Sequence, residues 1–174
     1  LKKKGGKSDV TDRFRKDLTA AVIVCSDTIS AGQKEDRAGK AIIKKLEESD
    51  VVISDYIVIP DEKDIIIEKA MAYQKQGIDL IIYTGGTGMS IRDVTPEALL
   101  PILDRRIPGI EEAIRNYGQD RTPYSMLSRS IAGTLKNSLV LGLPGSTNGA
   151  KESMDAIFPS VLHIFRILKG ARHD

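Results

Sequence analysis

A cluster of three glycines and two threonines is the part of this chain best suited to bind an anion. It follows the apolar run from Ile78 to Tyr83 and reads Thr84, Gly85, Gly86, Thr87 and Gly88. Glycine lets the backbone approach a ligand without a Cβ clash, and exposed amides at the carboxyl end of a strand favour phosphate. Threonine hydroxyls would add further donors. The same pentapeptide is also compatible with a plain tight turn between a strand and a helix.

Two aspartates accompany this loop. Asp61 follows the apolar run that ends at Pro60, and Asp93 lies five residues beyond Gly88. Hard divalent cations such as Mg²⁺ take oxygen ligands, so a pair of carboxylates beside a phosphate loop is what a magnesium nucleotide requires. The alternative is structural: Asp61 would cap the helix that follows it, and Asp93 would form a local turn or a helix N-cap.

Residues for nucleophilic or zinc chemistry are scarce. The single cysteine, Cys25, ends an apolar run and is best interpreted as a buried packing residue; it excludes an internal disulfide. His163 and His173 are the only histidines, too few for a zinc site or a Ser-His-Asp arrangement. Catalysis by this chain would therefore rely on positioning and charge.

Strand and helix patterns alternate through the first half of the chain. Apolar runs at 18–25, 51–60 and 78–83 predict strands, helical spacing at 38–48 and 64–76 predicts helices, and 26–36 reads as a loop. Short connections of this kind call for parallel strands, so we expect a three-layer α/β sandwich with a mostly parallel central sheet. Ligands bind at the carboxyl ends of such strands, which places Ser26, Asp27, Asp61 and the glycine loop at one edge.

The second half of the chain predicts helices at 96–103 and 109–118, on either side of Arg105 and Arg106. Residues 134–143 predict either a turn and a strand or a short hairpin about Lys136. A final helix is expected over 149–169, kinked by Pro159.

Charge and composition favour one folded domain, from residue 18 to residue 174, after a basic leader or linker of 17 residues. The leader holds seven Lys or Arg against three Asp. Its one aromatic residue and lack of a framework argue against a nucleic-acid site. No apolar run approaches the roughly 20 residues of a membrane span, and no secretory signal is present, so we expect no membrane partner and a cytoplasmic location.

An ordered series of motifs follows the glycine loop. It comprises Arg92-Asp93, Thr95-Pro96-Glu97, Asp104-Arg105-Arg106 with Pro108-Gly109, Thr122-Pro123 through Ser128-Arg129, and Leu143-Pro144-Gly145-Ser146. The series resembles the molybdopterin adenylyltransferase family, the MogA/MoaB-like proteins of molybdenum cofactor synthesis, whose domain also occurs in gephyrin. The resemblance extends over about residues 19–170.

This resemblance implies a reaction in which AMP from ATP is joined to the terminal phosphate of molybdopterin, with release of pyrophosphate. It implies that Asp61 and Asp93 are catalytic and hold Mg²⁺, while residues 84–88 contact the phosphates. The pterin pocket would draw on Ser125, Ser128, Arg129, Pro144, Gly145 and Ser146. Arg105 and Arg106 would contact either phosphate or another subunit, in a homotrimer or a dimer of trimers. The alternative is a molybdopterin-binding or scaffolding module without adenylylation.

The leader carries a resemblance of its own. Residues 1–8, with the run Lys4-Gly5-Gly6-Lys7-Ser8, resemble the C-terminal tail of a MoaC-like cyclic pyranopterin monophosphate synthase. On that interpretation a synthase domain would precede this chain in a bifunctional polypeptide, whereas a simple flexible leader is the alternative.

Overall fold

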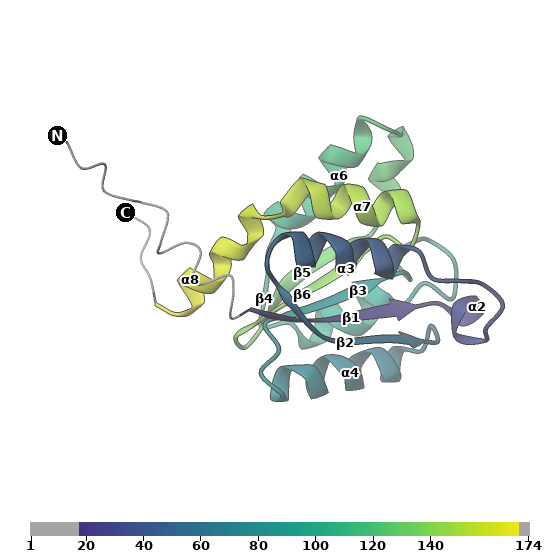
Figure 1. The fold of residues 1–174 in the computed structure, drawn as a ribbon. Helices are drawn as coiled ribbons and strands as arrows, with labels where there is room; N and C mark the ends of the chain where they lie inside the picture. Colours follow the sequence, from purple (N-terminus) through teal and green to yellow (C-terminus); the bar gives the residue numbers. More distant parts are fainter. Residues whose placement is uncertain (1–17, 171–174) are drawn as a thin grey trace.

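A six-stranded sheet forms the centre of the molecule, in the order β2-β1-β3-β6-β5-β4 (Figure 1). The computed structural model describes residues 18–170, so the predicted leader and its synthase-like motif lie outside the described residues. The strands β2 (Val52–Ile59), β1 (Thr19–Cys25), β3 (Leu80–Thr84) and β6 (Ser138–Leu143) are mutually parallel. β5 (Ile131–Leu135) is antiparallel to β6, and β4 (Arg105–Arg106) is antiparallel to β5. The predicted mostly parallel sheet is confirmed.

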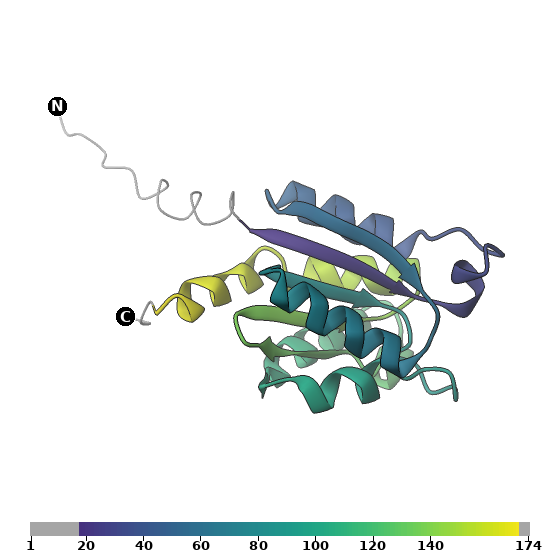
Figure 2. The same cartoon turned by 90° about the horizontal axis from the view of Figure 1, so that it is seen from below.

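Helices cover both faces of this sheet, which explains why its central strands are mostly apolar. All five residues of β3 and all six of β6 are buried. One face packs against α3 (Ala38–Glu48), α6 (Pro108–Gln119) and α7 (Thr147–Ile157). The other packs against α4 (Lys63–Lys75) and α5 (Thr95–Leu99), and Figure 2 shows α4 lying along the sheet on the side away from α3. A three-layer α/β sandwich results, as predicted.

The hairpin predicted as one alternative for the second half is present. β5 and β6 are joined at Lys136, whose φ of 52° closes a two-residue turn with Asn137. The hairpin begins at Ile131, three residues before the predicted start, because Ile131 and Ala132 pair with the end of β6.

Two predicted helices are shorter than expected. The final one is interrupted rather than kinked: α7 ends at Ile157, a 3₁₀ turn η3 (Ser160–His163) follows Pro159, and α8 (Ile164–Leu168) completes the segment. Proline lacks an amide hydrogen and cannot continue the helical ladder. The helix predicted at 96–103 is α5 followed by the 3₁₀ turn η1 (Leu100–Ile102), with Pro101 inside it.

Short helical turns lie in two segments that were not predicted to be helical. α2 (Asp27–Ser30) occupies part of the predicted loop after β1, where the Ser26 hydroxyl accepts from the Ile29 amide as its N-cap. The 3₁₀ turn η2 (Pro123–Leu127) follows α6 and is capped by Thr122. Within residues 18–170 no helix is long and apolar enough to cross a membrane.

Candidate active site

Two adjoining hollows lie at the edge of the sheet where the parallel strands end. The first, of about 410 Å³, is lined by ends of β1 and β3, by Asp61 and Asp93, and by Gly145 to Thr147. The second, of about 320 Å³, lies between α6, η2 and α7. Ser146 lines both hollows, so this residue forms part of the wall between them. Strand ends that are far apart in the sequence meet here, as expected for an open parallel sheet.

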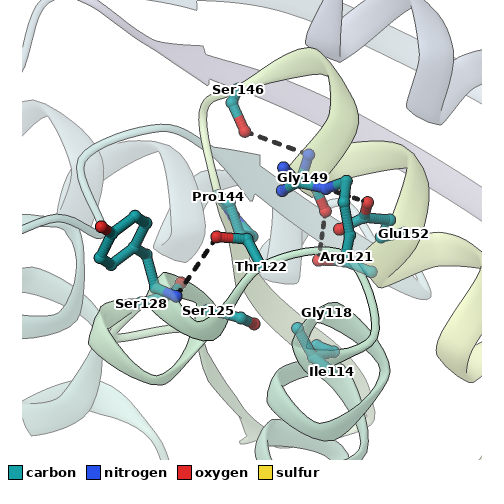
Figure 3. Close-up of a pocket in the computed structure, with 12 residues that line it drawn as sticks. Ile114, Gly118, Arg121, Thr122, Ser125, Ser128, Pro144, Ser146, Gly149 and Glu152 are labelled. Carbon is teal, nitrogen blue, oxygen red and sulfur yellow. Dashed lines mark hydrogen bonds and ion pairs between the residues drawn. The ribbon is translucent and has the colours of Figure 1, made fainter.

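The predicted site residues divide between the hollows. The first is lined by Asp61, Thr84, Gly85, Gly86, Asp93, Gly145 and Ser146. The second is lined by Ser125, Ser128, Pro144 and Ser146. Figure 3 shows Ser125, on the turn η2, and Ser128, directly after it, across the second hollow from α7. Thr87, Gly88 and Arg129 are not among the lining residues of either hollow. The residues expected to act on the nucleotide that line a hollow are all in the first one. Of the residues expected to contact the pterin, Gly145 lines the first hollow instead of the second, and Ser146 lines both.

The conformation of the glycine loop explains its composition. Gly85 has a φ of 101°, and a Cβ added to it would lie 2.2 Å from the carbonyl oxygen of Cys25. Gly86 has a φ of 69°, and an added Cβ would lie 2.3 Å from Oγ1 of Thr95. Both positions combine a backbone that L-residues rarely adopt with a close approach of neighbouring atoms. The loop can pass this close to the end of β1 only because these side chains are absent.

Hydrogen bonds decide which donors of the loop remain for a ligand. The Thr84 hydroxyl donates to the Pro144 carbonyl over 2.7 Å, and the Gly85 amide donates to the Leu143 carbonyl over 3.0 Å. Neither donor is free for phosphate, contrary to the prediction for these two groups. The amide of Gly86 has no acceptor among residues 18–170, and Gly86 lines the first hollow. It is the loop amide best placed for an anion.

Arg129 is an internal clamp on the segment that follows the glycine loop. Its guanidinium donates to the carbonyl of Gly88 over 2.9 Å and to that of Asp93 over 2.8 Å, and it also binds the Glu97 carboxylate. Its own amide donates to the carbonyl of Thr87. The predicted pterin contact is therefore at odds with its placement. Arg129 shapes the border of the first hollow from outside.

Asp61 is held by a reciprocal pair of hydrogen bonds with Asp27. The Asp27 amide donates to Oδ2 of Asp61 over 3.0 Å, and the Asp61 amide donates to Oδ1 of Asp27 over 2.9 Å. Burial raises the pKa of Asp61 above its ordinary value, and the negative charges of Asp27 and Asp93 add to that rise. Asp61 does not cap α4, whose N-cap is Glu62 without a side-chain bond. The helix-cap alternative for Asp61 is thus wrong.

Asp93 combines both of the roles that the sequence left open. Its Oδ2 accepts from the amide of Ser90 over 2.9 Å and from the Ser90 hydroxyl over 2.6 Å, which closes a local turn. The turn alternative is therefore confirmed. The same side chain lines the first hollow. A carboxylate has two oxygens, so the turn does not prevent Asp93 from binding a cation.

Asp27 and Arg92 complete the surroundings of Asp61, and neither was predicted to have a role of its own. Nε of Arg92 donates to Oδ2 of Asp27 over 2.9 Å, while its Nη2 reaches Glu62 over 2.8 Å. These bonds join the segments that follow β1, β2 and β3. The hydrogen bond from Arg92 holds the pKa of Asp27 below its ordinary value. The available signal was positional: Asp27 lies two residues beyond β1, and Arg92 adjoins Asp93.

Asp61 and Asp93 are better suited to bind a cation together with a substrate phosphate than to hold a cation with protein ligands alone. Within residues 18–170 no three His, Cys, Asp or Glu side chains are grouped to hold a metal. Asp61 and Asp93 each have one oxygen, Oδ1, that accepts no hydrogen bond within this range. Magnesium is commonly bound by one or two carboxylates together with substrate phosphates and water. Asp61 and Asp93 are the residues that fit this pattern.

Two further predictions concern residues outside this chemistry. Cys25 is buried, and that burial raises the pKa of its thiol to about 12, which makes it a poor nucleophile at neutral pH. Arg106 donates to the buried carboxylate of Glu111 over 2.6 Å and lies, with Arg105, on the edge strand β4. Neither arginine lines the hollows. A phosphate contact from either is not supported.

Comparison with known proteins agrees with this geometry. The family model described as a probable molybdopterin binding domain matches residues 21–163, which include the linings of both hollows. The chain belongs to this family. The molybdopterin biosynthesis enzyme MoaB of Thermus thermophilus has a TM-score of 0.83 and 35% identity, over 90% of this chain and 99% of that one. A MogA structure has a TM-score of 0.82 at 32% identity, over 86% and 99% of the two chains.

Curated members of the family include two kinds of polypeptide. Molybdenum cofactor biosynthesis protein B of Staphylococcus aureus is 35% identical over 90% of this chain and 95% of its own length. A molybdenum cofactor biosynthesis bifunctional protein of Chlorobaculum tepidum is 36% identical over 98% of this chain but only 54% of its own length. The chain therefore spans about half the length of such bifunctional relatives. Its place in molybdenum cofactor biosynthesis is supported by both kinds.

Proposed function

We propose that this chain transfers AMP from ATP to the terminal phosphate of molybdopterin and releases pyrophosphate. The observation that carries the proposal is the pair of hollows joined at Ser146. One hollow offers carboxylates and a free loop amide, as a nucleotide with its cation requires, while the other offers hydroxyls and apolar walls for a ring system. A reaction between two phosphate groups requires two such sites that touch.

The substrate supplies the nucleophile in this reaction. An oxygen of the molybdopterin phosphate attacks the α-phosphorus of ATP, a phosphorus–oxygen bond forms, and the bond to pyrophosphate breaks with its electron pair. The protein contributes position and charge, which suits a site without a reactive thiol or histidine. The Gly86 amide would donate a hydrogen bond to a phosphate oxygen. The N-terminus of α7, which begins after its N-cap Ser146, would place the positive end of the helix dipole near the phosphate.

Asp61 and Asp93 would hold a magnesium ion against the triphosphate through their Oδ1 atoms. Such an ion neutralises the charge that develops on pyrophosphate as it leaves. Arg92 and Asp27 keep the Asp61 backbone and side chain in place. Because ATP is consumed, we place the reaction in the cytoplasm.

One assay separates this proposal from a molybdopterin-binding or scaffolding module. The chain is mixed with molybdopterin, ATP and Mg²⁺, and pyrophosphate and adenylylated pterin are measured. Stoichiometric formation of both products is expected. Tight binding of molybdopterin without either product would identify the chain as a binding module instead.

Assembly forms a second part of the proposal. We expect a homotrimer, or a dimer of trimers, on the basis of the family resemblance. We also propose an upstream MoaC-like synthase domain in the same polypeptide; the match to a bifunctional relative supports a fusion to a further domain. Light scattering at micromolar concentration tests the first expectation, and a monomer would contradict it.

A further inference from the structure

The second hollow contains one carboxylate, and the proposed reaction gives that group no task. Glu152 is the only acidic residue among those that line this hollow, and Arg121 is the only cation. Nε of Arg121 donates to Oε1 of Glu152. Oε2 accepts no hydrogen bond from residues 18–170, although the Glu152 side chain is only 20% exposed. A partly desolvated carboxylate with an unused oxygen is expensive unless a ligand donates to it.

The position of Glu152 on α7 gives the hollow a direction. Ser146, Gly149 and Glu152 follow one another at intervals of three residues along one face of the helix, and all three line the hollow (Figure 3). Six residues of helix span about 9 Å. Ser146 lies at the N-terminus of α7 beside the first hollow, where an anion is favoured. Glu152 lies at the other end, where hydrogen-bond donors are favoured.

We propose that Glu152 recognises the aminopyrimidine edge of the pterin ring and so determines which end of the substrate faces the nucleotide. That edge presents a ring N–H and an amino N–H side by side, a pair of donors that the two oxygens of one carboxylate match. Arg121 is a positioning residue that fixes the carboxylate in the required orientation. The inference rests on the proposed function, because it assumes that a pterin occupies this hollow.

The orientation follows from the length of the helix stripe. Molybdopterin is an elongated molecule with the aminopyrimidine edge at one end and its phosphate at the other. With its donor edge on Glu152, the phosphate lies toward Ser146 and hence toward the first hollow. The reverse orientation would bring the phosphate against the Glu152 carboxylate, where like charges repel. Glu152 thus selects the productive orientation as well as the ring.

Glu152→Gln is the variant that tests this role, because the amide has the same shape but offers one acceptor and one donor. Affinity for molybdopterin, measured by fluorescence titration, should fall roughly ten- to hundredfold. Affinity for Mg²⁺ and ATP in the absence of pterin should be unchanged. Asp155→Asn is the matched control: Asp155 lies one turn further along α7 and pairs with Lys45 over 2.7 Å on α3, outside both hollows.

A pair of small ring probes separates recognition from a merely structural effect. Pterin carries the amino group, whereas lumazine has a carbonyl in its place. The unsubstituted protein should bind pterin at least about tenfold more tightly than lumazine, and Glu152→Gln should lose or reverse that preference, because its amide can donate to the carbonyl. A structural role would weaken both probes equally.

The outcomes distinguish this inference from the proposed function. If the protein binds molybdopterin and forms product, but Glu152→Gln keeps the affinity and the ring preference, the recognition role of Glu152 is overturned and the function stands. If the variant loses both probes equally, Glu152 is structural and the inference is again overturned. If the unsubstituted protein does not bind molybdopterin at all, the proposed function fails, and the inference fails with it.

Discussion

The two hollows share a wall but differ in the segments and the interactions that form them. The first is bounded mainly by loops, and these are tied together through charged groups: Arg92 joins Asp27 to Glu62, and Arg129 holds the carbonyls of Gly88 and Asp93. The second is bounded by two helices and the turn η2, and its lining combines hydroxyls and apolar groups with the single ion pair of Arg121 and Glu152. Carboxylates that hold a cation must be kept in fixed positions, whereas binding of a pterin ring requires a surface complementary to the ring. Substitutions in the two regions should therefore have separable effects.

The largest expected effect comes from the two carboxylates of the first hollow. Asp61→Asn and Asp93→Asn should each slow single-turnover adenylyl transfer by about a hundredfold or beyond, a loss of roughly 3 kcal/mol of transition-state stabilisation. Molybdopterin affinity should change little, because neither residue lines the second hollow. Asp64→Asn, on the exposed first turn of α4, is the control. Near-normal turnover in either site variant would remove that residue from the catalytic assignment.

The next effect concerns the fold of the glycine loop. Gly85→Ala should lower the free energy of unfolding by about 3 kcal/mol, since it combines a strained φ with a contact to the Cys25 carbonyl. Gly77→Ala is matched to it: Gly77 also has a positive φ, of 77°, but no atom lies within 4 Å of its added Cβ. The control should cost only about 1 kcal/mol. Urea unfolding measures the free energy of unfolding of both variants. If both lose the same amount, the contact of the added Cβ with the Cys25 carbonyl contributes nothing.

A smaller effect tests the placement of Arg129. Arg129→Met should remove the clamp on Gly88 and Asp93 and weaken binding of Mg²⁺ and ATP by about tenfold. Molybdopterin affinity should be retained, as Arg129 does not line the second hollow. Calorimetric titration of each ligand measures both quantities. A loss confined to the pterin would return Arg129 to the pterin site that the sequence suggested.

The smallest effect is on stability and depends on pH. Because the folded state raises the pKa of Asp61, ionising this group costs more in the folded chain than in the unfolded one. The penalty is absent below the ordinary value of 3.8 and grows as the pH rises through the folded pKa. Asp61→Asn should therefore raise the melting temperature slightly at pH 7, and the gain should vanish near pH 3.8. A gain that grows on acidification would contradict this sign.

Local patterns were sufficient to predict the sheet and much of the first hollow. Apolar runs, helical spacing and the rule that ligands bind at the carboxyl ends of parallel strands predict that Asp61, Asp93 and the glycine loop lie together. These signals depend on residues near one another in the chain. They did not determine which hydrogen bonds each group makes: the Thr84 hydroxyl and the Gly85 amide are satisfied by Pro144 and Leu143, about 60 residues away.

The sequence by itself determined the fold class, the family and several polar residues of the site, among them Asp61 and Asp93, because these follow from periodicity and motif order along the chain. Only the tertiary structure decided how these residues divide between two hollows and that Ser146 belongs to both. It also showed that Arg129 binds backbone carbonyls of the segment after the glycine loop and does not line the predicted pterin pocket. Glu152 and Arg121, 31 residues apart in the sequence, form an ion pair that lines the second hollow. Such pairings depend on how the helices pack on the sheet, and the spacing of residues along the sequence does not predict them.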